Sequence, residues 1–75
     1  MIVVFDIETT GLSITQDRIV EISMRKLDTM DNLDTLINPG RKIPQEVIAI
    51  HGIDDSMVAE APTFKEKARE IYDFL

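Results

Sequence analysis

Apolar residues fill positions 2–7 on both faces, which is typical of a strand covered on both sides. In residues 18–27 they instead alternate with polar residues, which predicts a second strand. A weaker third strand is expected over residues 33–37, after a polar turn at 28–32 and before Asn38-Pro39-Gly40. Together the three runs predict an antiparallel meander.

Beyond the third strand, the spacing of the apolar residues changes to one that is typical of helices. Pro44 suits a first helical position and Gly52 suits a C-terminal cap, so we expect a short helix between them. Asp54 is placed to cap a further turn. Thr63 and Glu66 have the spacing of a capping box, which predicts that the last helix begins directly after Thr63.

The last helix carries an apolar stripe that needs a sheet to cover it. The stripe consists of Phe64, Ala68, Ile71, Tyr72 and Leu75. No glycine, proline or basic residue marks a stop in its last turn. A single covering helix would also leave one face of the first strand uncovered. Both features indicate an incomplete α/β domain.

The chain has 75 residues, of which 44% are hydrophobic, and it has no apolar run long enough to span a bilayer. A small soluble domain is therefore expected. Chains of this size have little core and often depend on disulfides, metals or oligomerisation. Cysteine is absent, so disulfides are excluded. Because Met1 leads into the first strand without a basic segment, we expect a cytoplasmic location.

Fourteen acidic and eight basic residues give a formal net charge of −6. This negative charge argues against non-specific electrostatic binding to nucleic acid or anionic lipid. A nucleic-acid substrate would need local positive charge, from bound divalent cations and from basic side chains. The basic residues that could contribute are Arg18, Arg25, Lys26, Arg41 and Lys42.

An acidic pair, Asp6 and Glu8, stands in the first apolar run. Since residues two apart share a face of a strand, both carboxylates are expected on the same side of a buried strand. Burying two carboxylates at this spacing is costly unless a cation or a proton holds them. The pair therefore predicts a divalent metal site, whereas the plainer interpretation is two solvated acids at a strand end.

Thr9, Thr10, Gly11 and Leu12 follow the acidic pair directly. The threonines supply hydroxyls and backbone donors, and Gly11 lets a ligand approach the main chain closely. Leu12 offers an apolar contact where the loop leaves the strand. Acids for a metal, amides for a hydroxyl and a hydrophobe for a base predict a site for the end of a nucleic-acid strand.

Two segments, VFDIETTGL from Val4 to Leu12 and RIVEI from Arg18 to Ile22, resemble the first motif of the DEDD 3′-5′ exonucleases. This family includes the proofreading subunit of bacterial DNA polymerase III and ribonuclease T. INP at 37–39, IP at 43–44 and IHGI at 50–53 are similar, in the same order, to segments of its histidine-type, DnaQ-like subgroup. The resemblance covers most of the chain.

The resemblance implies a ribonuclease H-like α/β fold, of which residues 1–75 would be the N-terminal part. This part would be the three-stranded meander, short helices and one covering helix. The resemblance also implies two Mg²⁺ or Mn²⁺ ions about 4 Å apart, which support an in-line phosphodiester displacement. Asp6 would bridge both ions, while Glu8 would bind one and orient the attacking water. The amides around Thr9 and Thr10 would hold the terminal 3′ hydroxyl beside Gly11.

Two further residues receive roles from the same resemblance. Leu12 would wedge against the last bases, and His51 would line the pocket of the terminal nucleotide. The alternative for His51 is a structural role at a helix C-terminus, where the helix dipole favours it. A catalytic role is not expected, because the family's catalytic histidine lies much later in the chain. Glu21, the other acid within a strand, is expected to be a polar position on a half-exposed face.

The family's second and third motifs, which carry two further aspartates and the histidine general base, do not follow here. Two functions are therefore expected. The chain is either the front part of a metal-dependent 3′-5′ exonuclease for single-stranded DNA or RNA ends, inactive in isolation, or a non-catalytic remnant or interaction module. The expected partners are a single-stranded 3′ end, a DNA polymerase subunit and, through the bare sheet, a second copy, but not a membrane.

Overall fold

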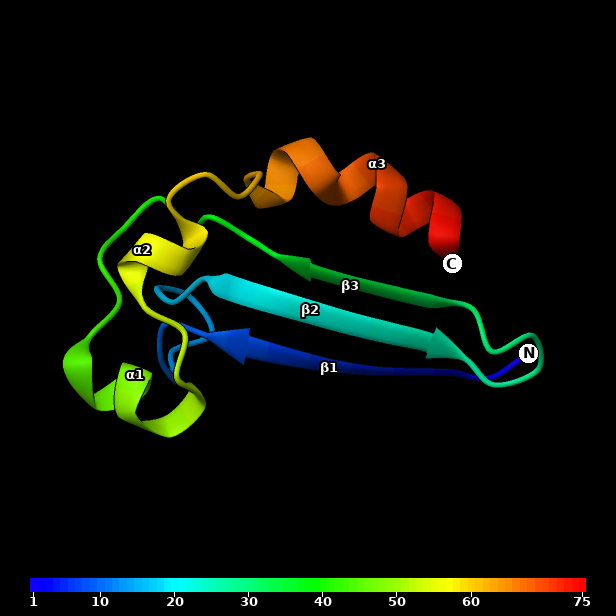
Figure 1. Cartoon of the computed structure of the whole chain (residues 1–75), viewed down its shortest axis with the longest axis horizontal. Helices are drawn as coiled ribbons and strands as arrows, with labels where there is room; N and C mark the ends of the chain where they lie inside the picture. The colour runs from blue at the N-terminus through cyan, green and yellow to red at the C-terminus, as the bar shows by residue number, and fades with distance from the viewer.

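The computed structural model describes all residues from Met1 to Leu75 and contains one sheet of three strands (Figure 1). These are β1 (Val3–Thr9), β2 (Ile19–Lys26) and β3 (Asn32–Leu36). Both neighbouring pairs are antiparallel in the order β1-β2-β3, which confirms the predicted meander. A bulge where β1 ends shifts the register between Glu8 and Thr9.

Three helices follow the sheet, namely α1 (Gln45–His51), α2 (Asp55–Val58) and α3 (Phe64–Phe74). Gly52 ends α1 in the left-handed conformation with φ 76°, and its N–H donates to the Ile48 carbonyl, as its sequence position predicted. The Asp54 side chain caps α2. Thr63 and Glu66 form the predicted capping box, in which each side chain accepts from the other residue's backbone N–H.

The predicted position of Pro44 is wrong by one residue. Its ψ of 144° is extended, so Pro44 is the N-cap of α1 and the helix begins at Gln45. The ring of proline fixes φ near −65°, a value that suits extended and helical backbone alike. The proline therefore indicates the region where a helix begins, but it does not determine which residue is the first of the helix.

Two adjoining apolar clusters hold the helices to the sheet. Beside the end of β1, where α1 and α2 gather, lies a buried cluster of Val20, Ile43, Ile53 and Val58. Under α3 lies a second cluster of Ile22, Met24, Ile37 and Ile71. Val20, Ile22 and Met24 thus form the buried face of β2, in agreement with their alternation in the sequence.

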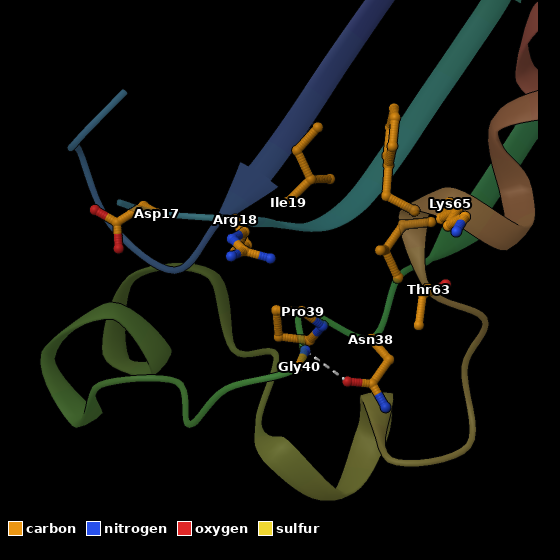
Figure 2. A pocket seen from close by; sticks show the side chains of 10 residues that line it. Asp17, Arg18, Ile19, Asn38, Pro39, Gly40, Thr63 and Lys65 are labelled. Atoms are coloured by element: carbon orange, nitrogen blue, oxygen red, sulfur yellow. Dashed lines mark hydrogen bonds between the residues drawn. The ribbon is translucent and has the colours of Figure 1, made fainter. Parts of the chain in front are cut away.

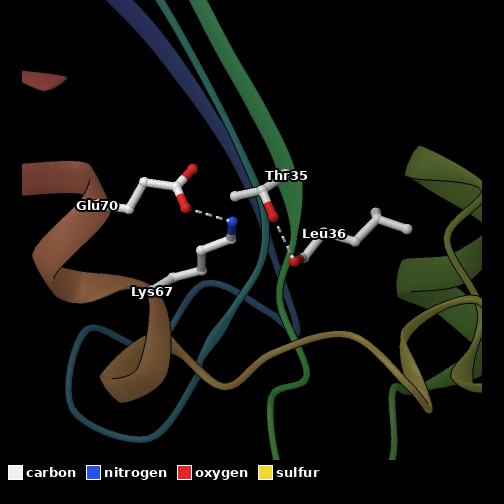
Figure 3. A network of polar contacts seen from close by, with 4 residues as sticks. All are labelled: Thr35, Leu36, Lys67 and Glu70. Carbon is white, nitrogen blue, oxygen red and sulfur yellow. Dashed lines mark hydrogen bonds and ion pairs between the residues drawn. The ribbon is translucent and has the colours of Figure 1, made fainter.

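The α3 helix crosses one side of the sheet near β3, and its predicted apolar stripe is only partly correct (Figure 1). Ile71 is buried, but Tyr72 is 74% exposed and Leu75 is also exposed. Tyr72 lies about 100° further around the helix than Ile71, which turns it away from the sheet. On the flank nearest β3, Lys67 forms a 2.9 Å ion pair with Glu70, close to Thr35 and Leu36 (Figure 3).

The expectation that β1 is covered on both faces is wrong for this chain. Val4 is 53% exposed and Phe5 is 64% exposed. The cause is topological, because β1 forms the edge of the sheet and α3 packs over the β2 and β3 side (Figure 1). Among the helices, none is long and apolar enough to cross a membrane.

Candidate functional site

The Asp6 and Glu8 side chains share the face of the sheet opposite to α3. Their positions alternate with Phe5 and Ile7, which stand opposite the buried Met24 and Ile22 of β2. Asp6 is exposed and Glu8 is half-buried, so the expected burial of the pair is not found. We refer below to the side of the sheet that carries Asp6 and Glu8 as the open face.

Neither carboxylate of the acidic pair has a partner within the chain. On the open face, Ser23 hydrogen-bonds to Asp34 and Arg25 hydrogen-bonds to Asn32, and both salt bridges of the chain lie on α3. Asp6 also lines a shallow groove of about 320 Å³ on the sheet. The two carboxylates are therefore accessible to a cation, although no group of three or more metal-binding side chains comes together in the structure.

Glu21 stands directly opposite Glu8 in the β1–β2 register and is half-buried, which agrees with the polar, half-exposed position expected for it. Like charges at directly opposite positions of a sheet repel. Glu21 therefore raises the negative potential around Glu8, which favours the binding of a cation at the acidic pair.

The loop after β1 is closed by Thr10, which is 1% exposed. Its N–H donates to the Arg18 carbonyl at 2.8 Å, and its hydroxyl donates to Asp17 Oδ1 at 2.8 Å and accepts from the Arg18 N–H at 3.0 Å. Both polar groups expected to serve a substrate are thus used inside the protein. The structure gives Thr10 the role of holding the loop against the start of β2.

Gly11 lies directly against another side chain of the loop. A Cβ at this position would lie 2.6 Å from the Asp17 carboxylate, so a larger residue would displace the Asp17 side chain from its hydrogen bonds with Thr10 and Ser13. On the other side, the Thr9 hydroxyl donates to the Gly11 carbonyl at 2.5 Å. Asp17, which the sequence did not single out, is therefore the centre of the loop, accepting also from the Ser13 N–H at 2.8 Å.

These contacts predict a pH dependence of the loop. The hydrogen bond from the Ser13 N–H, then that from the Thr10 hydroxyl and the charge of Arg41, hold the pKa of Asp17 below its ordinary value. Because the folded-state pKa is lowered, Asp17 stabilises the loop at pH values above its unfolded-state pKa of about 3.9, and this contribution is lost as pH falls through the lower folded-state pKa. Backbone NMR shifts of Ser13 should report this acid transition.

The Asp17→Asn variant is the control for that titration, since it removes the ionisable group. In this variant the Ser13 shift is expected to lose its acid transition. A Ser13 transition centred above the ordinary range of aspartate in the unmodified chain would contradict the hydrogen-bond network described for Asp17.

Leu12 projects from this loop into solvent, with an exposed fraction of 101%, and Ile14 does the same at 99%. Hydrogen bonds hold the loop that carries these two side chains: Asp17 accepts from the Ser13 N–H, and the Arg41 guanidinium donates to the Gln16 carbonyl. Two aliphatic side chains are thus presented next to the end of β1. Sequence reasoning identified Leu12 but missed Ile14, whose only signal is an apolar residue within a polar loop.

His51 joins α1 to the end of β1. Its Nε2 lies 3.0 Å from the Thr9 carbonyl, and its Nδ1 lies 3.0 Å from the Ile53 N–H. Because Nδ1 accepts from a backbone N–H, the proton of the neutral ring is on Nε2 and is donated to Thr9. The structural role considered for His51 is therefore present, and a contact with a nucleotide would have to use the ring face or edge.

A cavity of about 450 Å³ is separate from the acidic pair (Figure 2). It is formed by the start of β2, the segment after β3 and the start of α3, with Arg18, Pro39, Phe64 and Lys65 among its lining residues. The Asn38 side chain accepts from the Gly40 N–H at 2.8 Å and shapes the turn below it. Neither Asp6 nor Glu8 contributes to this cavity.

Known proteins are similar to this chain in sequence and in fold. A DNA polymerase III subunit epsilon-like protein of Rhodobacter capsulatus is 45% identical over an alignment of 78 positions, and the alignment covers 96% of this chain and 11% of that protein. The PolC-type DNA polymerase III of Caldanaerobacter subterraneus is 41% identical over 75 residues, covering 96% of this chain and 5% of that protein. The chain thus spans a small part of the length of these relatives.

A solved structure of exonuclease X in complex with 5′ overhanging duplex DNA matches with a TM-score of 0.82 and 32% sequence identity. The match covers 95% of this chain and 43% of exonuclease X, and it confirms the ribonuclease H-like fold. A family model named for ribonuclease T and described as exonuclease matches residues 3–75. The chain accordingly belongs to the family of ribonuclease T-type and DnaQ-like 3′-5′ exonucleases and corresponds to the N-terminal part of their domain.

Proposed function

We propose that this chain supplies the first motif of a metal-dependent exonuclease that removes nucleotides from single-stranded 3′ ends of DNA or RNA. The observation that carries this proposal is the placement of Asp6 and Glu8. Both lie on the open face of β1, both lack partners in the chain, and the loop that presents Leu12 follows them directly.

The donor set fits a hard divalent cation. Asp6 and Glu8 would hold Mg²⁺ or Mn²⁺ through carboxylate oxygens, and such ions retain several waters when the protein supplies few ligands. The bound cation would supply activation of water and neutralisation of charge on the scissile phosphate. Two carboxylates are enough for weak binding, and the absence of a third neighbouring ligand agrees with an incomplete site.

Substrate contacts are assigned to the loop and to the end of α1. Leu12 would press against the terminal bases, because an aliphatic side chain that is fully exposed gains from covering the apolar face of a base. Thr9 and Gly11 would approach the terminal 3′ hydroxyl through their backbone. Thr10 would act indirectly by fixing the loop, and His51 would support the same region through its bond to the Thr9 carbonyl.

We further propose that the 75-residue chain is inactive alone. It has neither the additional aspartates nor the general base that the family chemistry requires, and no other cluster of acidic residues and histidine replaces them. The competing function is a non-catalytic interaction module, which the exposed edge of β1 favours. Both functions predict no turnover by the isolated chain.

Cation binding tests the metal site on which the exonuclease proposal depends. In the isolated chain, Mn²⁺ is expected to broaden the backbone NMR signals around Asp6 and Glu8 first, because a paramagnetic ion relaxes the nuclei nearest to it. The Asp6→Asn variant should lose this local broadening, since it removes one of two ligands. Asp34→Asn is the matched control, as Asp34 lies on the same face but is hydrogen-bonded to Ser23. Equal broadening in the Asp6→Asn variant and the unmodified chain would reject the metal site.

A further inference from the structure

Asp17 holds the loop that follows β1 at two separate points. One carboxylate oxygen, Oδ1, accepts from the Thr10 hydroxyl at 2.8 Å, and the other, Oδ2, accepts from the Ser13 N–H at 2.8 Å. Thr10 is buried and comes two residues after Glu8, so it forms the base of the loop. One side chain therefore connects the end of β1 that carries the acidic pair with the tip of the loop.

Ser13 is held through both of its backbone groups and its hydroxyl. Besides the bond from the Ser13 N–H to the carboxylate, the Asp17 N–H donates to the Ser13 carbonyl at 3.0 Å. The Ser13 hydroxyl accepts from the Gln16 N–H at 3.2 Å. Leu12 and Ile14, the two fully exposed aliphatic residues, flank Ser13 directly. Because the peptide planes on both sides of Ser13 are fixed, the directions of these two side chains are restricted.

The Asp17 carboxylate itself has little freedom to move. The loop backbone at Gly11 packs directly against it, as the 2.6 Å approach of an added Cβ shows. Arg41 donates to the carbonyl of Gln16, the residue that precedes Asp17. Both side-chain hydrogen-bond partners of Asp17 belong to the loop, so the order of the loop arises largely within it.

We propose that Asp17 is a positioning residue for the substrate, which presets Leu12 and Ile14 as a two-residue apolar contact for the last bases of a single-stranded 3′ end. This inference rests on the proposed function and adds Ile14 to its substrate contacts. Covering a base with an aliphatic side chain removes apolar surface from water. A loop that is ordered before binding loses less conformational freedom on binding. Asp17 therefore acts on the affinity for the strand rather than on the chemical step.

Backbone order parameters of the chain test the presetting. We expect values near about 0.85 for Ser13 and Ile14 in the unmodified chain and below about 0.6 in Asp17→Ala, which loses both side-chain bonds. Asp31→Ala is the matched control, since Asp31 accepts from the Thr29 hydroxyl in the turn between β2 and β3 and should leave Ser13 ordered. A mobile Ser13 in the unmodified chain, or an ordered one in a folded Asp17→Ala variant, would overturn the proposal.

Strand binding tests the consequence for the substrate, in a chimera in which residues 3–75 replace the matching part of exonuclease X. The dissociation constant of a labelled single strand is measured in Ca²⁺, and nucleotide release at saturating strand is measured in Mg²⁺. Asp17→Ala should raise the dissociation constant about tenfold and leave the rate of release within about threefold of the parent. Asp17→Asn keeps an oxygen that accepts from the Ser13 N–H, so it should recover part of the affinity.

A double-mutant cycle distinguishes positioning from a general loss of stability. Leu12→Ala and Ile14→Ala should each weaken strand binding by the parent chimera but have little further effect in Asp17→Ala, because a disordered loop no longer presents them. Additive effects, an Asp17→Ala affinity within about twofold of the parent, or no strand binding by the parent would overturn the proposal. Asp17-dependent binding without release of nucleotides would support the positioning role and reject the exonuclease function.

Discussion

Replacing Asp6 by Asn is expected to reduce 3′-end trimming by at least about a thousandfold in a chimera in which residues 3–75 replace the matching part of exonuclease X. The physical reason is that a metal-bridging carboxylate sets the position and charge of the cation, and cation stabilisation of the transition state amounts to several kcal/mol. The TM-score of 0.82 makes this exchange structurally reasonable. The measurement is the initial rate of release of nucleotides from a labelled single strand in Mg²⁺.

Asp34→Asn in the same chimera controls for a general change of charge on the open face. Asp34 accepts a hydrogen bond from Ser23 and is not part of the acidic pair, so this variant should remain within about twofold of the parent rate. If Asp6→Asn trims as fast as Asp34→Asn while both remain folded, Asp6 is not a metal-bridging residue.

The second large effect is expected on stability, from Ile43→Ala. Ile43 is completely buried in the cluster with Val20, Ile53 and Val58, and its N–H donates to Asp55 at 2.9 Å. Truncating a buried isoleucine to alanine costs about 2–5 kcal/mol. Domains have about 0.05–0.15 kcal/mol of stability per residue, so this loss is a large fraction of the total for a chain of 75 residues. The free energy of unfolding from urea titration is the measurement.

Ile50→Ala tests whether burial rather than residue type causes this loss. Ile50 carries the same side chain on the exposed surface of α1, and its truncation should change the free energy of unfolding by no more than about 0.5 kcal/mol. Similar losses for the two variants would show that the cluster around Ile43 does not hold the helices to the sheet.

Local chemistry explains what the sequence predicted well. Gly52 and the Thr63–Glu66 capping box act within a few residues of themselves, and the alternation of Val20, Ile22 and Met24 reflects the period of a single strand. These features appear in the structure as expected because no distant contact decides them. The same applies to the shared face of Asp6 and Glu8, which follows from their separation by two residues.

Contacts between distant segments decide the features that the sequence could not predict. The exposure of β1 depends on which strands and helices lie next to it. The apolar sequence of β1 does not specify these neighbours. Thr10 is buried because Asp17 and Arg18 return to it, and Gly11 lies against the same Asp17 carboxylate. Likewise, the bond from His51 to the Thr9 carbonyl joins residues 42 positions apart.

The direction of degradation by the parent chimera tests the central claim most directly. A single strand labelled at its 5′ end is expected to be shortened progressively from the 3′ end in Mg²⁺, while a strand labelled at its 3′ end is expected to lose the label in the first products. A folded chimera that leaves both strands intact, or that cuts them internally, would contradict the assignment of Asp6 and Glu8 to a 3′-5′ exonuclease site.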